Sequence, residues 1–232
     1  MMERPSEESV SIMFEKSLRD RSFRLSQKET EHYVDEFDGL SGRADFVISP
    51  TDLNSIPQNI IERFVRGIST PASASIVGLL IQGKQSIKEI VERLCLSRNT
   101  VTKCIKKLEA ERIAVRNDDD TVEILDSFVV PSIELWAIEL KVENWRRAIY
   151  QSLQYRSFSH ITVIVIPMMY SKRILAHRDQ FQTFNIGVIA LDLTNGSMRT
   201  IIRAAKDDPS DNDQHLYAKS VFLRRLHPEI NL

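Results

Sequence analysis

Apolar positions follow a helical spacing in some stretches of the chain and alternate in others. Residues 6–20 carry apolar side chains on one helical face, with Ser6 as a candidate N-cap, which predicts an amphipathic helix. Residues 32–37 and 43–48 predict two strands, and the two glycines between them favour a hairpin. The chain is therefore expected to begin with a helix and a β-hairpin.

The middle of the chain has a different pattern. Short turns separate four helical stretches, which we expect at 56–68, 73–82, 87–94 and 99–112. Two short extended runs follow at 113–116 and 121–125, around a polar turn. This block is mostly helical and ends before Pro131.

Extended segments return after Pro131. Apart from Glu134, residues 133–141 are apolar on both faces until Glu139 and Lys141, as in a buried central strand. Further along we expect a helix at 144–158, a strand at 161–166, a helix at 171–184, strands at 186–193 and 198–204, a loop at 206–214 and a final short helix. The pattern predicts an α/β core made of residues 1–50 and 128–232, with residues 51–127 inserted as a second domain.

Composition adds few constraints. The chain has 232 residues, 42% hydrophobic and 27% charged, and a formal net charge of −1, which is typical of a globular protein. It shows neither a membrane-spanning apolar run nor a signal-peptide start, so we expect a cytoplasmic protein without membrane contact. Cys95 and Cys104 lack zinc-site spacing and are expected to be reduced structural thiols.

Basic residues concentrate between Lys84 and Arg116. This stretch holds nine Lys and Arg residues against four Glu residues, an excess of five positive charges. A local basic excess in a nearly neutral chain is typical of a nucleic-acid-binding surface.

The same stretch predicts a helix, a tight turn, a second helix capped by Ser97 and a two-stranded wing. Three apolar side chains on the second helix would pack inward, namely Val101, Ile105 and Leu108. We expect its polar positions and the wing to contact DNA through Arg98, Asn99, Thr100, Thr102, Lys103, Lys106 and Arg116. About 50 residues here resemble winged helix-turn-helix domains of bacterial and archaeal regulators. A winged helix used only for protein contacts is the alternative.

Glu139 and Lys141 share one face of the predicted central strand. Burying a carboxylate and an ammonium group is costly unless they pair with each other or hold a metal ion. The predicted hairpin supplies a further carboxylate, Asp45, on its second strand.

The order of helix, hairpin, Glu139-Leu140-Lys141 strand, helix and strand resembles the PD-(D/E)xK, or restriction-endonuclease-like, nuclease superfamily. That resemblance implies an αβββαβ core with a mixed central sheet. It also implies that Asp45 and Glu139 coordinate Mg²⁺ or Mn²⁺, and that Lys141 positions water and stabilises charge on the phosphate.

Two further features match the family. Members often carry a Gln, sometimes as QxxxY, on the helix after the ExK strand, and this chain has Gln151 and Tyr155 at that spacing there. Some members use a first-helix Glu, for which Glu7 is the main candidate, with Glu8 and Glu15 as weaker ones. The chain departs from the pattern by lacking a Pro before Asp45 and by the long separation of Asp45 from Glu139, which the insertion would explain.

The sequence thus favours a metal-dependent DNA endonuclease with winged-helix DNA binding. The alternative is a DNA-binding transcriptional regulator whose nuclease-like part is an inactive scaffold, with Glu139 and Lys141 as an ion pair. RNA as the substrate stays open. Cutting both strands of a duplex would call for a homodimer, and the sequence shows no interface.

Overall fold

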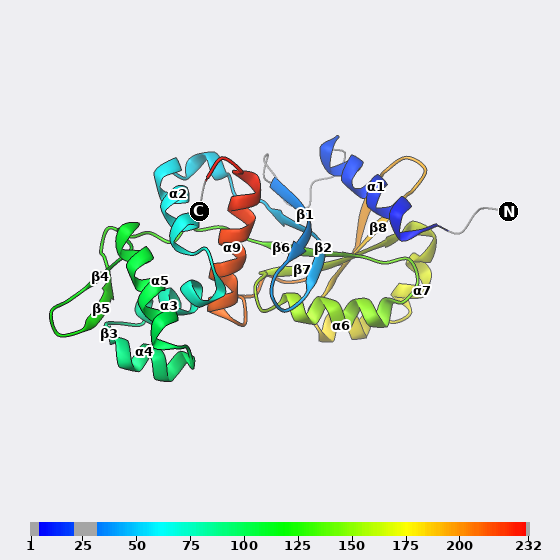
Figure 1. The fold of residues 1–232 in the computed structure, drawn as a ribbon. Helices are drawn as coiled ribbons and strands as arrows, with labels where there is room; N and C mark the ends of the chain where they lie inside the picture. The colour runs from blue at the N-terminus through cyan, green and yellow to red at the C-terminus, as the bar shows by residue number, and fades with distance from the viewer. Residues whose placement is uncertain (1–4, 21–31, 231–232) are drawn as a thin grey trace. The chain divides into compact units, whose positions relative to one another are not determined.

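The computed structural model describes residues 5–20 and 32–230 (Figure 1). Contacts divide the chain into two compact units, each formed by two separate segments. Unit 1 comprises Met1–Thr51 and Glu134–Ser210, and unit 2 comprises Asp52–Ile133 and Asp211–Leu232. The fold is mixed α/β, as expected from the sequence.

Unit 1 is built on a mixed six-stranded sheet. Its strands follow the order β1 (His32–Asp38), β2 (Arg43–Ser49), β6 (Trp136–Leu140), β7 (Ile161–Pro167), β8 (Gly187–Leu191) and β9 (Met198–Ile202). Strands β6, β7 and β8 are parallel to one another, and the other neighbouring pairs are antiparallel. The β-branched and apolar run of β7 is buried almost throughout, as a central strand requires.

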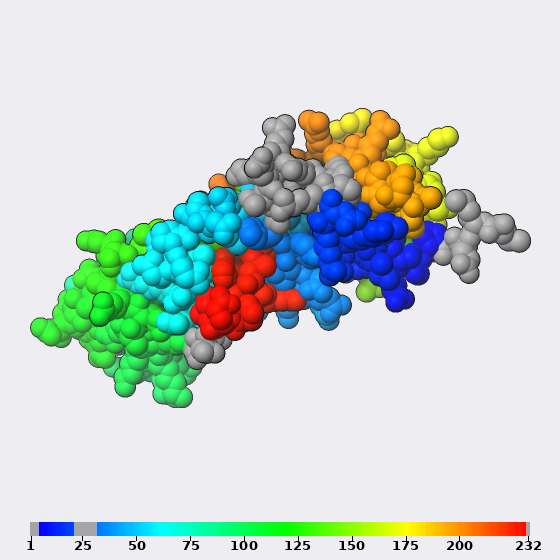
Figure 2. Space-filling model, turned by 90° about the horizontal axis from the view of Figure 1, so that it is seen from above, coloured from blue at the N-terminus to red at the C-terminus, as the bar shows by residue number. Residues whose placement is uncertain are grey.

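Helix α1 (Glu7–Arg19) covers one face of this sheet, and its residues form the dark blue part of the surface in Figure 2. The Ser6 side chain accepts a hydrogen bond from the Ser9 backbone N–H, which confirms the predicted N-cap. Val10 and Phe14 are fully buried, and Phe14 packs edge-on against Phe46 of β2 with ring centroids 5.2 Å apart.

Helix α6 (Trp145–Tyr155) and the segments after β7 cover the other face. These segments are η2 (Met168–Tyr170), α7 (Ser171–Leu175) and α8 (Arg178–Thr183). The expectation of one continuous helix over 171–184 is wrong. The chain leaves helical geometry at His177, whose ring stacks on Trp145 at a centroid distance of 4.7 Å. Packing against α6 therefore outweighs local helical propensity at this point.

Unit 2 combines helices with a small sheet. Its helices are η1 (Leu53–Ser55), α2 (Gln58–Gly67), α3 (Pro71–Ile81), α4 (Ile87–Leu94), α5 (Arg98–Ala110) and α9 (Asn212–Leu226). Its sheet has the order β3 (Gln85–Ser86), β5 (Thr121–Ile124) and β4 (Ala114–Arg116). Strand β3 was not predicted, because two residues are too few to establish an alternating pattern.

Helix α9 corrects the predicted domain boundaries. Residues 211–232 belong to unit 2 and not to the sheet-containing core, and α9 is a full-length helix rather than a short one. Its apolar residues Leu216, Phe222 and Leu223 are buried. A Cβ at Gly78 of α3 would lie 2.0 Å from an Asp213 carboxylate oxygen, so glycine permits this close approach. Long-range packing of this kind leaves no local sequence signal.

Among the described residues no single helix is both long and apolar enough to cross a bilayer. Helices α2 and α3 pass that test only together, as a pair bent by 111°.

Candidate active site and nucleic-acid interface

The pairing of β2 with β6 brings Asp45 and Glu139 to neighbouring positions in unit 1. Phe46 pairs with Ile138, and the same antiparallel register continued by one residue sets Asp45 opposite Glu139. Directly opposed residues in such a pair have Cβ atoms about 5 Å apart. The Asp45 Oδ2 atom accepts a hydrogen bond of 2.6 Å from the Leu140 N–H, which holds this carboxylate against β6.

Successive side chains of β6 point to opposite faces of the sheet, so Glu139 lies on the other face from its apolar neighbours Ile138 and Leu140. Ile138 and Leu140 pack in the core under α1, whereas Glu139 contacts Tyr155 of α6. The Tyr155 hydroxyl oxygen lies 2.6 Å from Glu139 Oε2 and 2.7 Å from the Arg43 carbonyl oxygen. One phenol group therefore links β6 to the start of β2.

The environment of the two carboxylates favours their protonated forms. Glu139 is only 2% exposed, and burial raises its pKa to about 7. The hydrogen bond from Tyr155 opposes this rise, while the charge of Asp45 adds to it. Burial also raises the pKa of Asp45. A cation bound between them would favour the ionised form of both carboxylates.

Lys141 lies just beyond the end of β6. Its backbone N–H donates to the Val165 carbonyl oxygen at 2.9 Å, which extends the pairing with β7. Its Nζ atom lies 2.9 Å from Glu7 Oε1 and 3.9 Å from Glu139 Oε1. The side chain is 13% exposed, so the ammonium group is mostly enclosed between two carboxylates.

Of the three candidate glutamates in the first helix, only Glu7 contacts the Lys141 ammonium group within the described structure. Glu15 instead pairs with Arg19 at 2.5 Å and accepts a longer hydrogen bond from Tyr33. Glu8 is exposed. The structure therefore brings together Glu7, Asp45, Glu139 and Lys141.

Gln151 lies on α6 one turn before Tyr155. Its Oε1 atom is buried and has no hydrogen-bond partner in the part of the chain that is described. A buried amide oxygen without a partner is costly, so it is available to an incoming donor. The QxxxY match includes both Gln151 and Tyr155, and their i,i+4 spacing places them on one helical face, but it assigns no role to the tyrosine.

The site offers two carboxylates to a metal ion. No group of three or more His, Cys, Asp or Glu side chains within residues 5–20 and 32–230 is arranged to hold one. Magnesium is commonly held by one or two carboxylates, with water and substrate phosphates completing its six oxygen ligands. Asp45 and Glu139 fit that kind of site, and they do not fit an all-protein cage.

In unit 2, α4 and α5 are joined by a tight turn. Cys95 adopts left-handed backbone geometry after α4 (φ 51°), and Ser97 caps α5 by accepting from the Thr100 N–H at 3.1 Å. Val101, Ile105 and Leu108 are buried, as predicted from the apolar stripe.

The opposite side of α5 presents the predicted DNA-contacting residues. Four of them are exposed: Arg98, Asn99, Lys103 and Lys106. The other two, Thr100 and Thr102, are half-buried. Both threonine hydroxyls are already engaged, because Thr100 pairs with Ser97 at 2.8 Å and Thr102 donates to the Arg98 carbonyl at 2.8 Å. The available polar atoms on α5 are therefore mainly cationic or amide groups.

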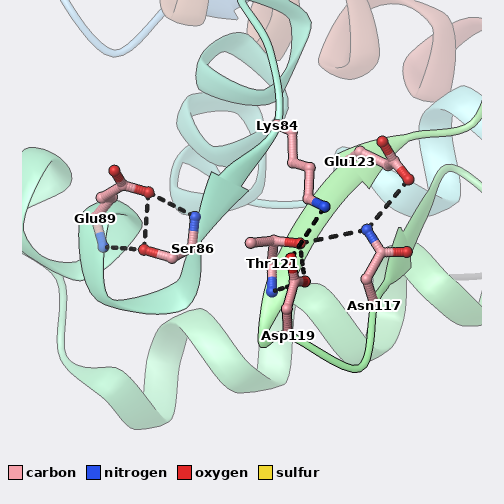
Figure 3. A network of polar contacts seen from close by, with 7 residues as sticks. All are labelled: Lys84, Ser86, Glu89, Asn117, Asp119, Thr121 and Glu123. Atoms are coloured by element: carbon pink, nitrogen blue, oxygen red, sulfur yellow. Dashed lines mark hydrogen bonds and ion pairs between the residues drawn. The ribbon is translucent and has the colours of Figure 1, made fainter.

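The turn between β4 and β5 is held by side-chain contacts (Figure 3). Asn117 donates to Glu123 at 3.1 Å, and Asp119 accepts from both the Thr121 backbone N–H and its hydroxyl. Lys84, which precedes β3, donates to Asp119 at 3.2 Å. Nearby, Ser86 and Glu89 form a reciprocal capping box at the start of α4.

This turn is acidic and neutralises part of the basic surface. Arg98 and Arg116 both pair with Asp120, the former at 3.8 Å. Between Lys84 and Glu123 the chain holds nine basic and eight acidic residues, so the excess found for 84–116 nearly disappears once the turn is included. Arg98 and Arg116 are exposed but not electrostatically free.

Comparisons of the chain with family models, curated protein sequences and solved structures found no match. Function is therefore inferred from the chemistry of the residues that the fold assembles.

Proposed function

We propose that this protein is a nuclease that hydrolyses phosphodiester bonds with the help of a bound Mg²⁺ or Mn²⁺ ion. In this proposal unit 1 is a restriction-endonuclease-like core and unit 2 carries an inserted winged helix that binds DNA. The observation that carries the proposal is the placement of Lys141 Nζ 3.9 Å from Glu139, beside Asp45 on the neighbouring strand. Two carboxylates and one ammonium group in this arrangement suit hydrolysis of a phosphate ester.

Each residue has a defined role in this proposal. Asp45 and Glu139 would hold the metal ion, which supplies charge stabilisation to the phosphate when bound. Lys141 would hold the attacking water and stabilise negative charge on the phosphate oxygens. Glu7 orients the Lys141 ammonium group through their 2.9 Å contact. In the overall reaction the water oxygen bonds to phosphorus, the bridging P–O bond breaks, and a proton passes from the water to the departing oxygen.

Tyr155 and Gln151 would complete the site from α6. The Tyr155 hydroxyl fixes the orientation of the Glu139 carboxylate. The buried Gln151 Oε1 would accept a hydrogen bond from water or substrate. Both are positioning roles, because neither side chain supplies a charge.

The winged-helix part of the proposal rests on α5. Its exposed face carries Arg98, Asn99 and Lys103 in its first two turns, where a recognition helix meets base edges and phosphates. Replacing these three residues with alanine is expected to weaken duplex binding and to make it less salt-dependent. The matched control is Lys88→Ala on α4, an exposed lysine that pairs with Glu92. Equal binding by the triple variant and the wild type would remove α5 from this role.

The nuclease proposal is tested with purified full-length protein and three substrates: plasmid, single-stranded and branched DNA, with RNA as a further arm. We expect cleavage that requires Mg²⁺ or Mn²⁺ and is lost in Lys141→Ala and in Asp45→Asn. The control Lys16→Ala removes a cation near the end of α1, away from the Glu7 end of that helix. Cleavage that persists in Lys141→Ala would mean that another site or a contaminant is responsible.

A DNA-binding regulator with an inactive core is the second candidate. The 2.9 Å Lys141–Glu7 ion pair favours it, because such a pair gives Lys141 a structural role without catalysis. This candidate predicts specific duplex binding through α5 and no metal-dependent cleavage of any of the substrates.

A further inference from the structure

Five exposed cationic side chains occur near Lys141 in unit 1, and the proposed function does not use them. We call them the basic rim: Arg146, Arg147, Lys172, Arg173 and Arg178. They come from the first turn of α6, from α7 and from the start of α8. From Lys141 to Arg178 the chain contains seven Lys and Arg residues and one acidic residue, Glu143. This is a larger basic excess than that of the α5 region.

Trp145 connects α6 and α8, two of the helices that carry the basic rim. The Arg146 guanidinium lies 4.5 Å from the centre of the Trp145 ring, and the His177 ring stacks on the same indole at 4.7 Å. Phe181 of α8 contacts it as well, with centroids 5.6 Å apart. Trp145 is only 3% exposed, so α6 and α8 are packed firmly together at this point. Figure 1 shows α7 near the beginning of α6.

The basic rim adjoins the candidate active site. Lys141, Trp145, Tyr170 and Arg173 line one small pocket, together with Glu143 and neighbouring apolar residues. Arg173 therefore shares a surface depression with the proposed catalytic lysine. A strand whose scissile phosphate reaches Lys141 would bring its neighbouring phosphates over this part of the protein.

The positive charges of the basic rim are not neutralised within the described structure. None of its five side chains has a carboxylate partner within 4.0 Å among residues 5–20 and 32–230. The α5 region differs, because Lys84, Arg98 and Arg116 pair with Asp119 or Asp120. Unpaired cations can bind phosphates without first breaking an ion pair, and they gain from the release of counterions.

We infer that the basic rim binds the sugar-phosphate backbone of the nucleic-acid strand that enters the Lys141 site. This inference rests on the proposed function, because it takes the nucleic-acid strand to lie with its scissile phosphate at Lys141. It places the protein's contacts with the backbone of that strand in unit 1. Phosphates are the ligand chemistry that fits several guanidinium groups beside a stacked indole. A guanidinium group can hold two phosphate oxygens at once, and the rim carries four arginines among its five cations.

The test measures binding of the full-length protein to labelled single-stranded and duplex DNA and RNA in EDTA, where no cleavage occurs. The main variant is Lys172→Glu with Arg173→Glu, and the second is Arg147→Glu, which leaves the Arg146–Trp145 contact in place. The matched control is Arg203→Glu. Arg203 is also exposed. It follows Ile202, which pairs with Val188 near the start of β8, whereas Lys141 and η2 follow the opposite ends of the neighbouring parallel strands.

We expect the double reversal to weaken binding at least about tenfold and to reduce the slope of log affinity against log salt by about two. Arg147→Glu should reduce that slope by about one, and Arg203→Glu should leave it unchanged. The DNA and RNA arms show which backbone is bound. Equal effects of Arg203→Glu and Arg147→Glu would overturn the inference, since the two variants change the net charge by the same amount.

The outcomes also separate this inference from the proposed function. Rim-dependent binding with no cleavage in Mg²⁺ or Mn²⁺ would support the basic rim and contradict the nuclease. Cleavage that depends on Lys141 but proceeds normally in the rim variants would support the nuclease and overturn the basic rim. Absence of nucleic-acid binding would also overturn the inference.

Discussion

Tyr155 places its hydroxyl oxygen 2.6 Å from the Glu139 carboxylate and 2.7 Å from the Arg43 carbonyl oxygen. One phenolic proton thus faces two acceptors. If Glu139 is protonated, its carboxyl group can donate to the Tyr155 hydroxyl, which then donates to the Arg43 carbonyl oxygen. Each of the three groups then has a hydrogen-bond partner. If Glu139 is ionised, the two acceptors compete for the same proton. The protonation of Glu139 therefore determines the hydrogen bonding between α6 and β2.

Tyr155→Phe removes this link and leaves Glu139 and the Arg43 carbonyl without the phenol. We expect the free energy of unfolding to fall by about 1–3 kcal/mol, because buried polar groups lose their partner. The cleavage rate at low metal concentration should fall more than the rate at saturating metal, since the carboxylate is less well oriented. Tyr150→Phe on the exposed side of α6 is the control. Equal behaviour of the two variants would exclude a positioning role for Tyr155.

Glu139→Gln tests the cost of burying this carboxylate. The folded-state pKa of about 7 lies above the usual value of 4.5, so the folded protein holds this proton more tightly than the unfolded chain. The resulting stabilisation is complete below about pH 4.5 and is lost as the pH rises through about 7, in total about 3 kcal/mol. In metal-free buffer we expect Glu139→Gln to melt above the wild type at pH 8 and close to it at pH 4. A Tm difference that does not change with pH would contradict the raised pKa.

Asp120→Asn tests the acidic turn of unit 2. Asparagine tolerates the left-handed backbone at this position (φ 64°), and the change releases Arg98 and Arg116 from their shared partner. We expect tighter binding of duplex DNA, and we expect the slope of log affinity against log salt to become steeper by about one. Asp118→Asn removes the same charge from the same turn and disrupts no ion pair seen in the described residues. If both variants bind equally, only net charge matters and the Asp120 pairs have no specific effect.

Gly39→Ala tests the hairpin that presents Asp45. A Cβ at Gly39 would lie 2.3 Å from a carbon of the fully buried Phe158 ring, so the ring or the hairpin must move. We expect a loss of about 1–3 kcal/mol in the free energy of unfolding, measured by denaturant titration. Gly42→Ala should cost less, because the added Cβ would lie 3.0 Å from the end of the Gln154 side chain and 3.1 Å from the Tyr155 ring. A larger loss for Gly42→Ala would mean that this packing is described wrongly.

Local patterns in the sequence predict much of the fold. The helical spacing of Val10, Phe14 and Leu18 predicts α1 and its buried face, and the Ser6 and Ser97 caps are also predicted correctly. These features depend on residues within one or two turns of each other. The same is true of the β1–β2 hairpin and of the apolar run in β7.

Features that depend on distant contacts could not be predicted. Helix α9 belongs to unit 2 because its apolar face is buried there and Gly78 admits Asp213, and no local pattern identifies that partner. The break at His177 depends on stacking against Trp145, which is 32 residues earlier in the chain. The pairing of Arg98 with Asp120 is not evident from the basic excess of residues 84–116, because that stretch ends before the acidic turn.

The candidate site lies between these two cases. The spacing of Glu139 and Lys141 predicts a shared strand face, and the structure places their side chains 3.9 Å apart. Asp45 could be connected to them only through the family resemblance, because more than 90 residues separate it from Glu139. The resemblance identifies Tyr155 only as the last residue of a QxxxY motif, because the hydrogen bond that it donates to Glu139 depends on how distant segments pack.

The position of a bound metal ion tests the central claim most directly. A crystal of the full-length protein grown with Mn²⁺ and measured at a wavelength where manganese scatters anomalously would locate the ion. We predict one anomalous peak within coordination distance of carboxylate oxygens from both Asp45 and Glu139, and its loss in Asp45→Asn. A protein saturated with Mn²⁺ that shows no peak between these two residues, or one that binds Mn²⁺ only elsewhere, would contradict the proposed active site.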